Sequence, residues 1–380
     1  MNGAVRKDRM YRYLLVLTVA SAIGLQGWRT LFNNFAVEVA GLDGHQVGII
    51  QSVREIPGFL ALLVVYVLLV MREHRLSALS ILCLAVGVGL TGLMPSMAGL
   101  VATTLIMSFG FHYYETTNQS LTLQYFDQAT APIVFGRQRS YAAATNIVVG
   151  LAIYGMASVL SYAAMYLVMG IVLCGMGLWG FAQNPVRENL PVQRKRMVLR
   201  RRYGLFYLLT FLAGARRQIF IAFAVFLMVK RFGFTVQEIT LLFVVNNGVN
   251  YYLSPLVGKA IVRFGERRVL SLEYGSMVLI FLAYALVQAK WIVAVLYILD
   301  HIFFNFAIAI RTYFQKVADP RDIAPSMAVG FTINHIAAVA LPAVGGLLWM
   351  VDYRIPFVGG AFMALLSLLA VQFIRVPASA

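Results

Sequence analysis

Tyr13-Leu14-Leu15 opens a long apolar segment near the start of this chain, and Tyr207-Leu208-Leu209 opens a second one in the other half. The likeness continues downstream, where Gln46-Val47 returns as Glu238-Ile239 and Glu73-His74-Arg75 returns as Glu266-Arg267-Arg268. Ala131-Pro132 and Ala324-Pro325 follow at almost the same interval. Segment 13–75 thus recurs near 207–268, and the sequence predicts two copies of one structural unit.

The composition is that of a membrane protein. Hydrophobic residues make up 61% of 380 positions, charged residues make up 12%, and the mean hydropathy is +0.79. A helix needs about 20 mainly apolar residues to cross the hydrocarbon core of a bilayer. Continuous apolar runs of that length favour helices over the alternating strands of a barrel. We predict twelve spans, at 11–37, 45–70, 77–95, 98–125, 138–160, 163–182, 204–229, 237–262, 269–288, 291–316, 325–350 and 355–374.

The basic residues indicate topology. The net charge is +16, but 22 of the 31 Lys and Arg residues fall on one predicted side of the membrane and four fall on the other. This asymmetry follows the positive-inside rule, so we expect both termini and the central loop to be cytoplasmic. A nucleic-acid partner is a poor explanation of the charge, whereas contact with anionic membrane lipids suits it.

One hydrophilic stretch divides the spans. Residues 183–203 contain the basic run from Arg194 to Arg202 and separate six spans from six. We therefore expect an N-terminal six-helix bundle at 1–182, a cytoplasmic basic linker at 183–203 and a C-terminal six-helix bundle at 204–380. The other loops are short, and the sequence has no ATPase cassette or phosphate-binding loop. Energy for any pumping must then come from a gradient or from a partner subunit.

The loop after the eighth span carries a family motif. It reads Gly258-Lys259-Ala260-Ile261-Val262-Arg263-Phe264-Gly265-Glu266-Arg267-Arg268. This resembles the loop motif of the major facilitator superfamily, a Gly, an acidic residue and Arg, then Gly-Arg-Arg/Lys, although Val262 stands at the acidic position. The equivalent loop in the first half, residues 71–75, keeps only the basic character. The resemblance implies an all-α membrane fold, with twelve transmembrane helices in two pseudo-symmetric six-helix bundles. It also implies a gating loop with Gly258, Arg263, Gly265, Arg267 and Arg268.

Polar residues are unevenly shared among the spans. Ionisable side chains inside a bilayer are costly, so each one is a functional hypothesis. The interiors of spans three, six and twelve hold no charged residue, and span nine holds only Glu273, which we expect to pair with the adjacent basic loop. In the family that the chain resembles, helices three, six, nine and twelve face lipid and the others surround a central cavity. The polar residues follow that division.

A layer of these residues lies at similar depth in both halves. The layer comprises residues about 9–19 positions into their spans, at 1.5 Å per residue: Arg29, Glu55, Glu115, Arg217, Asp300 and His335. Five intramembrane arginines stand against three carboxylates at similar depth, and a guanidinium suits a carboxylate or a phosphate. We therefore expect a small anionic or zwitterionic organic solute. The residues expected to bind it are Arg29, Asn33, Asn34, Arg216, Arg217, Asn246, Asn250, Asn305 and Asn334. Pairing within the protein, such as Arg54 with Glu55 or Arg216 with Asp300, is the alternative for any single arginine.

Protons are the expected coupling ion. A carboxyl group in a partly dry cavity can titrate near neutral pH, and histidine already does so. Glu115 with His112 and Asp300 with His301 are the two expected pairs, on repeat-equivalent spans four and ten. Hydrogen bonds that merely tie helices together, worth about 1 kcal/mol each, are the alternative. The expected proton-coupling residues are Glu115, His112, Asp300, His301, His335 and Glu55.

Other functions use the same residues. Imidazole and carboxylate groups suit a divalent transition metal, but no two histidines have the i, i+4 spacing of a helical site and nearby arginines repel a cation. Efflux of amphipathic drugs suits the 13% aromatic content and the Met-rich walls. A non-transporting receptor or scaffold would gain nothing from buried charge, and an enzyme would need a nucleophile–base motif. We expect a monomeric secondary transporter of a bacterial inner membrane, with a solute, protons and lipids as partners and with no cofactor or resident metal.

Overall fold

The structure is a computed structural model that describes residues 3–376. Within that range the side chains at positions 3, 4, 44, 222, 236, 237, 337–340, 342 and 343 are not described. Every regular element between residues 3 and 376 is helical, so the predicted all-α fold is confirmed.

The first six predicted spans are all helical. They correspond to α2 (Arg9–Glu38), the group α3 (Gly44–Val53), α4 (Ile56–Phe59), η1 (Leu60–Leu63) and α5 (Val64–Val67), then α6 (Glu73–Thr91), α7 (Met97–Tyr125), α8 (Ala131–Met156) and α9 (Tyr162–Ala182). A short helix, α1 (Gly3–Lys7), precedes them.

The last six predicted spans are helical as well. They correspond to α10 (Gly204–Phe232), α11 (Val236–Phe264), α12 (Glu266–Leu286), the group α13 (Lys290–Phe304), η3 (Asn305–Ala307) and α14 (Ile308–Val317), then α15 (Ile323–Val351) and α16 (Arg354–Val371). Two short 3₁₀ turns, η2 (Arg201–Tyr203) and η4 (Pro320–Asp322), lie between long helices. The twelve-helix prediction therefore agrees with the helices of residues 3–376.

By length and composition, eight helical segments in the described part of the chain could cross a membrane. They include α2, α6, α9, α10, α12 and α16, together with the two segments that 3₁₀ turns interrupt. Three of the other long helices, α7, α8 and α11, carry many of the polar side chains, and six side chains of α15 are not described. The chain is thus an integral multi-pass membrane protein whose polar load is concentrated in a few helices.

The internal repeat is visible in how helices begin. Asp43 accepts a hydrogen bond from the backbone N–H of Gln46 at 2.8 Å, and the Gln46 side chain accepts one from the Asp43 N–H at 3.0 Å. Thr235 and Glu238 form the same reciprocal capping box at 3.2 and 2.8 Å, before α11. Such a box satisfies two backbone donors that the helix itself leaves unpaired. The Gln46 and Glu238 match noted in the sequence therefore marks equivalent helix starts.

A second pair of equivalent contacts confirms the repeat. Glu73, in the first turn of α6, accepts a hydrogen bond from the Gln124 amide at the end of α7, at 2.7 Å. Glu266, in the first turn of α12, pairs with Lys316 near the end of α14, with Nζ and Oε1 2.8 Å apart. Both glutamates therefore anchor the start of one helix to the end of the next membrane span.

The chain forms two compact units whose boundaries cross its two halves. The first unit contains Met1–Tyr125, Tyr141–Val198 and Pro320–Thr332. The second contains Phe126–Ser140, Leu199–Asp319 and Ile333–Ala380. Each half of the sequence thus gives a short segment to the unit formed mainly by the other half: the start of α8 belongs to the second unit, and the start of α15 belongs to the first. Most of the predicted linker 183–203 is irregular, with η2 at its end.

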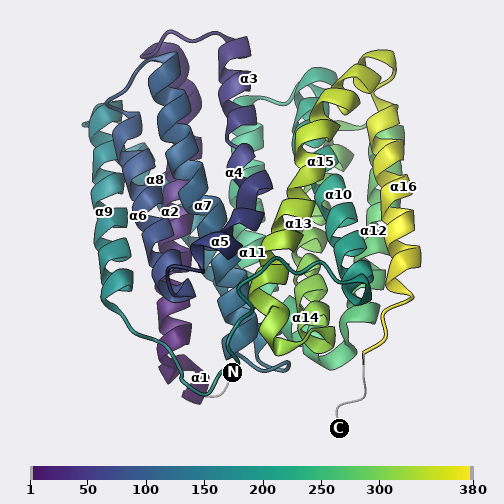
Figure 1. Cartoon of the computed structure of the whole chain (residues 1–380). Coiled ribbons are helices and arrows are strands. Elements are labelled where there is room, and N and C mark those ends of the chain that lie inside the picture. Colours follow the sequence, from purple (N-terminus) through teal and green to yellow (C-terminus); the bar gives the residue numbers. More distant parts are fainter. Residues whose placement is uncertain (1–2, 377–380) are drawn as a thin grey trace. The chain divides into compact units, whose positions relative to one another are not determined.

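The first unit packs around α6, which contacts both α7 and α9, and α2 packs against α9. Figure 1 shows these helices running alongside one another. The interior is aromatic, with Trp28, Phe32, Phe35, Tyr114 and Tyr166 fully buried. The rings of Phe35 and Tyr166 meet edge to face with centroids 5.5 Å apart.

Span two is interrupted in this unit. Its helical segments break at Arg54 and Glu55, just before Pro57, because proline lacks a backbone donor and clashes with the preceding turn. The backbone N–H of Leu62 donates instead to the Thr332 hydroxyl at 2.9 Å. A side chain from the start of α15 therefore satisfies a donor in an irregular stretch.

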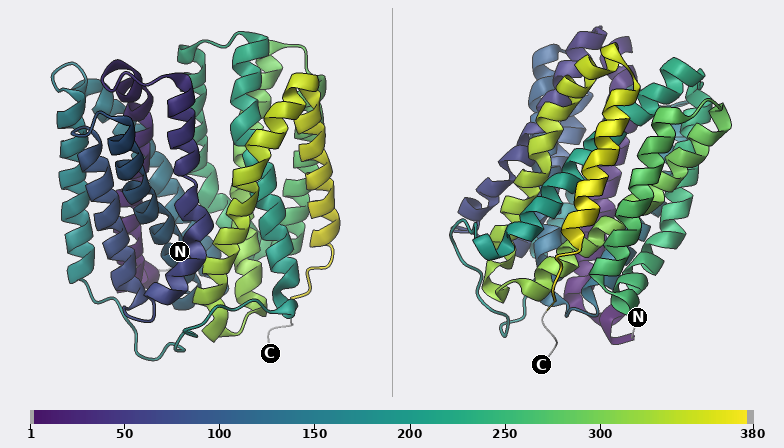
Figure 2. Two further views of the ribbon diagram at one scale, coloured as in Figure 1. Left: turned by 45° about the horizontal axis from the view of Figure 1, so that its top comes forward. Right: turned by 90° about the vertical axis from the view of Figure 1, so that its right-hand side faces the viewer.

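In the second unit α12 packs against α16, and α13 contacts both α11 and α12. Figure 2 shows α16 in yellow beside its helical neighbours. The core of this unit includes Phe281, Tyr284 and Phe357, and the Tyr284 and Phe357 rings stack with centroids 5.2 Å apart. These helices form the frame on which the charged residues of α10, α12 and α13 are placed.

Candidate functional site

The predicted solute-binding residues of span one lie on α2 with exposed side chains. Arg29, Asn33 and Asn34 are all exposed, and Arg29 and Asn33 are one helical turn apart on the same face. Arg29 is the twenty-first residue of α2, about 30 Å from the first residue at 1.5 Å per residue. An arginine facing hydrocarbon at such a position would be costly. This face of α2 is therefore suited to a polar cavity.

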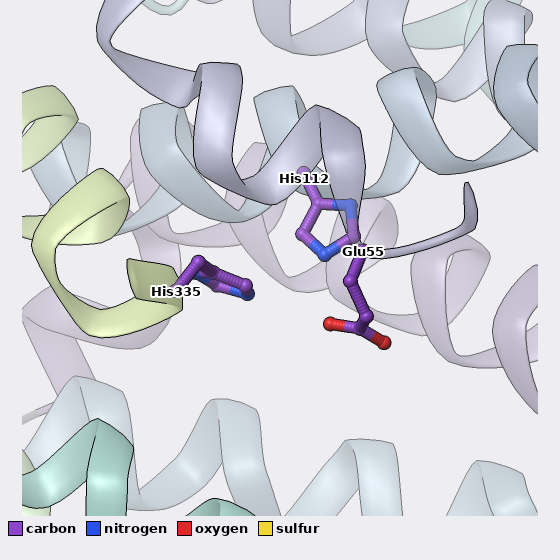
Figure 3. Close-up of side chains that lie close together, drawn as sticks. All are labelled: Glu55, His112 and His335. Atoms are coloured by element: carbon purple, nitrogen blue, oxygen red, sulfur yellow. The ribbon is translucent and has the colours of Figure 1, made fainter. Parts of the chain in front are cut away.

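Glu55 and His112 come together inside the first unit. Figure 3 labels both residues, and a carboxylate oxygen of Glu55 lies within 4.8 Å of a ring nitrogen of His112. Glu55 is paired with its neighbour Arg54, with Oε1 and Nη2 2.8 Å apart. This is the internal pairing that the sequence left open for Arg54. Figure 3 also labels His335, which belongs to the second unit.

The surroundings of His112 fix its ring. Nδ1 lies 2.9 Å from both the hydroxyl and the carbonyl oxygen of Ser108, one turn earlier on α7. The Ser108 hydroxyl also donates to the carbonyl oxygen of Arg54. Glu115 follows three residues after His112 and is half-buried. The first unit thus holds an oriented imidazole close to a carboxylate that already has a cationic partner.

The second unit contains a small pocket with charged walls. Arg216 on α10 is 5% exposed, and its Nη1 lies 3.5 Å from Oε1 of Glu273 on α12. Its guanidinium stacks over Tyr274, 4.2 Å from the ring centre. Asp300 on α13 is 1% exposed and lines the same pocket, as does half-buried Arg217. The pocket has room for about one water molecule.

Glu273 has a different partner from the one expected from the sequence. We expected it to pair with the basic loop next to its helix, but its ion pair is with Arg216, 57 positions earlier in the chain. It lies eight residues into α12, so its carboxyl group is inside the bundle and beyond the reach of the loop. The predicted alternative pairing of Arg216 with Asp300 is not the ion pair that forms. The charged residue of span nine therefore belongs to the interior of the second unit.

Asp300 and His301 do not form the expected pair. His301 Nδ1 lies 2.9 Å from the carbonyl oxygen of Tyr297, and its ring packs edge-on against Phe220 and Tyr297. Asp300 instead lines the pocket beside Arg216. Consecutive residues of a helix point about 100° apart, so one of them can face the pocket while the other packs against aromatic rings.

Two predicted asparagines join an arginine that the sequence did not select. Asn305 donates to Oδ1 of Asn250 at 2.5 Å, and its own Oδ1 accepts a bond from Nε of Arg139 at 2.7 Å. Arg139 stands at the start of predicted span five, 138–160, and is one of the 22 basic residues predicted to lie on the cytoplasmic side. In the structure α8 begins at Ala131, so Arg139 lies more than two turns inside the helix. It brings the start of α8 to α11 and η3 within the second unit.

The other predicted site residues of the second unit are Asn246, Asn334 and His335, and all three are at least partly buried. Asn246 is 2% exposed, and neither its Nδ2 nor its Oδ1 has a hydrogen-bond partner in the described part of the chain. Such a group costs about 1–3 kcal/mol unless water or a ligand satisfies it. Asn334 donates to the carbonyl oxygen of Thr210 at 3.1 Å, which ties α15 to α10. His335 is 3% exposed.

The predicted gating loop is held by contacts within the second unit. Gly265 ends α11 with a φ of 78°, a conformation that favours glycine. Arg267 donates to Oε1 of Gln372 from Nε at 3.2 Å and from Nη2 at 3.1 Å. Arg263 and Arg268 are exposed, and Gly258 is buried. Glu266, four residues after the motif's usual acidic position at Val262, is the buried acid of this loop and pairs with Lys316.

Comparisons with known proteins show the family of the chain and solved structures with a similar fold. The profile of the family described as "Major Facilitator Superfamily" matches residues 14–340. No protein of curated function matches the chain. Among solved structures, the human organic anion transporter MFSD10 (TETRAN) is 12% identical and has a TM-score of 0.78, covering 98% of this chain and 100% of that one.

Two bacterial structures are similar as well. The fucose:proton symporter FucP of E. coli is 12% identical with a TM-score of 0.78, and the match covers 96% of this chain and 98% of that one. A bacterial homologue of the iron transporter ferroportin, in an outward-facing state, is 15% identical with a TM-score of 0.70 and the same coverage. At these identities the likeness shows the fold alone.

Proposed function

Because the chain belongs to the major facilitator superfamily, whose profile covers most of its length, we propose that it is a secondary transporter of a small anionic or zwitterionic organic solute. It would carry this solute across a bacterial inner membrane by alternating access, with both termini in the cytoplasm. The basic excess on one predicted side of the membrane supports that orientation.

The observation that carries the proposal is the exposed polar face of α2. Arg29, Asn33 and Asn34 are exposed on a helix that is apolar enough and long enough to cross the membrane. Since a charged side chain facing lipid is strongly disfavoured, this face would line the aqueous path. A guanidinium with neighbouring amides offers donors suited to a carboxylate or a phosphate.

Two other arginines are less suited to binding the solute, because carboxylates are close to them. Arg54 pairs with Glu55, and Arg216 pairs with Glu273. Arg217 is half-buried at the pocket of the second unit. We propose Arg29, on the exposed face of α2 in the first unit, and Arg217, at the pocket of the second unit, as separate first candidates for binding an anionic group. Asn33, Asn34, Asn246, Asn250, Asn305 and Asn334 would orient it, and the unsatisfied amide of Asn246 supports a polar ligand near α11.

Proton coupling completes the proposal. Binding of solute or proton must favour one orientation of the cavity, because otherwise no gradient could drive net transport. Glu115 and Asp300 are the candidate carriers, on the equivalent helices α7 and α13. The solved structures with this fold include a fucose:proton symporter, which is consistent with this choice.

A divalent metal is the second candidate substrate. The carboxylate of Glu55 and the imidazole of His112 lie within 4.8 Å of each other, which suits a transition metal. One similar structure is that of a bacterial homologue of an iron transporter. Against this candidate, the guanidinium of Arg54 already binds the Glu55 carboxylate.

A thermal-shift screen of the purified protein in detergent tests the proposal. The panel would hold small organic anions, phosphorylated metabolites, divalent metals and lipophilic cations. An anion should raise the Tm of the wild type and have little effect on Arg29→Gln and Arg217→Gln. Arg231→Gln, an exposed arginine at the end of α10, is the matched control and should respond as the wild type does.

Uptake or counterflow of the stabilising anion in proteoliposomes would then confirm transport. Stabilisation by metals alone, lost in His112→Ala and kept in Arg29→Gln, would replace the anion with a divalent cation. Stabilisation by lipophilic cations alone would indicate drug efflux.

A further inference from the structure

Two buried carboxyl groups line one pocket beside a buried guanidinium in the second unit. Glu273 and Asp300 are 2% and 1% exposed, and both line the pocket next to Arg216. Oε2 of Glu273 and Oδ2 of Asp300 have no hydrogen-bond partner in the described part of the chain. Among the described residues, these side chains form one ion pair shorter than 4.0 Å. It joins Arg216 to Oε1 of Glu273. Asp300 is therefore a buried acid whose oxygen faces a water-sized space without a partner.

The charges of this cluster do not balance. Arginine stays protonated in proteins, so Arg216 supplies one positive charge. If Glu273 and Asp300 were both ionised, the three residues would carry one net negative charge away from water. An isolated buried charge is very unfavourable, and a carboxyl group in that position takes up a proton instead. A single proton on either acid makes the cluster neutral.

The charged and titratable groups near Asp300 come from the helices packed around it. From α10, Arg216 and Arg217 line the pocket, and neither carboxyl group forms an ion pair with half-buried Arg217 in the described structure. From α12, Glu273 lines the pocket, the Tyr274 ring stacks with the Arg216 guanidinium, and Tyr284 is buried. On α13 itself, Tyr297 is nearby and His301 bonds to a backbone carbonyl. Helix α11 has no charged residue between Glu238 and Lys259.

We infer that Glu273 and Asp300 share one exchangeable proton in the pocket beside Arg216, and that this carboxyl pair is a proton site of the transporter. The role of this pair in transport rests on the proposed function, whereas the shared proton itself does not. The proton resides on one carboxyl oxygen while the other carboxylate is neutralised by Arg216. Release of the proton to water leaves both acids ionised and one negative charge in the cluster.

Arg217 gives the site a link to the solute. It lines the same pocket and is only half-buried, so a solute anion can reach it. An anion bound at Arg217 would bring a negative charge to the carboxyl pair and favour its protonation. By linkage, protonation of the pair strengthens binding of the anion to the same degree. Anion and proton then move in the same direction.

Infrared spectroscopy of the purified protein tests the shared proton without any substrate. A protonated carboxyl group has a C=O stretching band that an ionised carboxylate lacks. We expect difference spectra at neutral pH to show that both Asp300→Asn and Glu273→Gln lose one such band relative to the wild type. Either substitution leaves a single carboxylate, which Arg216 neutralises, so the proton is no longer needed. Loss of the band in the Glu273 variant is the decisive result, because an Asp300 that held its proton without Glu273 would still show the band.

Variants of the arginine and a control complete the design. Arg216→Gln removes the positive charge, so both acids should be protonated and the band should about double, whereas Arg216→Lys should restore the wild-type spectrum. Glu238→Gln is the matched control, because Glu238 is an exposed carboxylate that pairs with Lys290. Its spectrum should equal that of the wild type. All variants are compared only at equal gel-filtration profiles, and Glu273→Met, which also removes the second carboxyl group, replaces Glu273→Gln if that variant does not fold.

Three results would overturn the inference. A wild-type band that survives in Glu273→Gln would show that Asp300 holds its proton alone. Spectra of both variants identical to the wild type would show that neither acid is protonated. A band that disappears when potassium is replaced by sodium at constant pH would assign the pocket to that cation.

Transport assays separate this inference from the proposed function. If the bands behave as expected but no anion is transported in proteoliposomes, the proton site stands and the anion assignment fails. If an anion is transported with unchanged pH dependence in both variants, the anion assignment stands and the pair is not the coupling site.

Discussion

Asn305 donates a hydrogen bond to the side-chain oxygen of Asn250 at 2.5 Å, and it accepts one from Arg139 at 2.7 Å. One amide thus connects three helical segments of the second unit. We expect Asn305→Ala to lower the free energy of unfolding by about 1–2 kcal/mol, because interhelical hydrogen bonds in membrane proteins contribute about 0.6 kcal/mol on average and up to about 1.7. Reversible unfolding in mixed micelles measures the change.

The control for this prediction is Ser52→Ala on α3. The exposed Ser52 hydroxyl donates to the carbonyl oxygen of Gly48 in its own helix at 3.1 Å, so its loss should cost less than about 0.5 kcal/mol. Equal effects of the two substitutions would mean that the Asn305 connections contribute nothing beyond an ordinary surface hydrogen bond.

Glycine is required where α8 crosses α11. A Cβ atom at Gly258 would lie 2.4 Å from the carbonyl oxygen of Pro132, and one at Gly136 would lie 2.5 Å from that of Ser254. Both obstacles are backbone atoms, so the helices themselves would have to separate. We expect Gly258→Ala to destabilise the protein by about 1–3 kcal/mol, the usual cost of overpacking. Thermal unfolding of the purified variant measures this.

Gly248→Ala is the matched control on the same helix. A Cβ atom there meets nothing within 4 Å, and alanine favours a helix over glycine by up to about 1 kcal/mol. This variant should be neutral or slightly more stable. If the two alanine variants unfolded at the same temperature, the close approach at Gly258 would not constrain the fold.

The repeated capping boxes predict matched effects in the two halves. Asp43→Ala and Thr235→Ala each remove the side-chain acceptor of an N-terminal backbone N–H. Each should cost about 1 kcal/mol. Thr145→Ala, whose hydroxyl bonds to the carbonyl oxygen of Tyr141 in its own helix, should cost less. Unequal effects of the first two would argue that the repeat is not equivalent in energy.

The central linker is fastened to the start of α15. Asp322 is fully buried and pairs with Arg194, with Oδ1 and Nε 3.0 Å apart, and the backbone N–H of Arg194 donates to the carbonyl oxygen of Arg321 at 2.8 Å. We expect Asp322→Asn to speed trypsin cleavage at exposed Lys195 about fivefold, the effect of about 1 kcal/mol on a local opening equilibrium. Timed digestion followed by gel electrophoresis gives the rate.

Asp352→Asn serves as the control, since exposed Asp352 only caps a turn at Arg354 near the start of α16. Its cleavage rate in the linker should match the wild type. Unchanged cleavage in Asp322→Asn would show that the backbone contacts alone hold the linker.

The helices could be predicted from sequence because a segment that crosses a bilayer must satisfy its own backbone hydrogen bonds. Apolar runs of spanning length locate each helix, and local signals such as Asp43 with Gln46 or Thr235 with Glu238 locate some of the starts. The interruption of span two was also foreseeable, because Pro57 follows the break at Glu55.

The partners of the charged residues could not be predicted in the same way. Hydropathy gives the depth of a residue but not the direction of its side chain or the neighbour across a helix interface. Glu273 was therefore expected at the loop, although Arg216 is its partner. Arg139 was counted outside the membrane because the apolar run of span five begins near it, while α8 begins eight residues earlier. Polar residues that neighbouring helices shield can extend a span without any apolar signal.

Because residues 320–332 belong to the first compact unit, that unit stays incomplete until the ribosome has made most of the chain. Val64, Val65 and Leu76 are inserted early, yet Ala328, which packs with them, emerges much later. The start of α8 must likewise wait for the helices of the second unit. Insertion into the membrane and completion of the fold are therefore separate events, and a nascent chain halted near residue 300 would leave its first bundle open to insertases, chaperones and quality-control proteases.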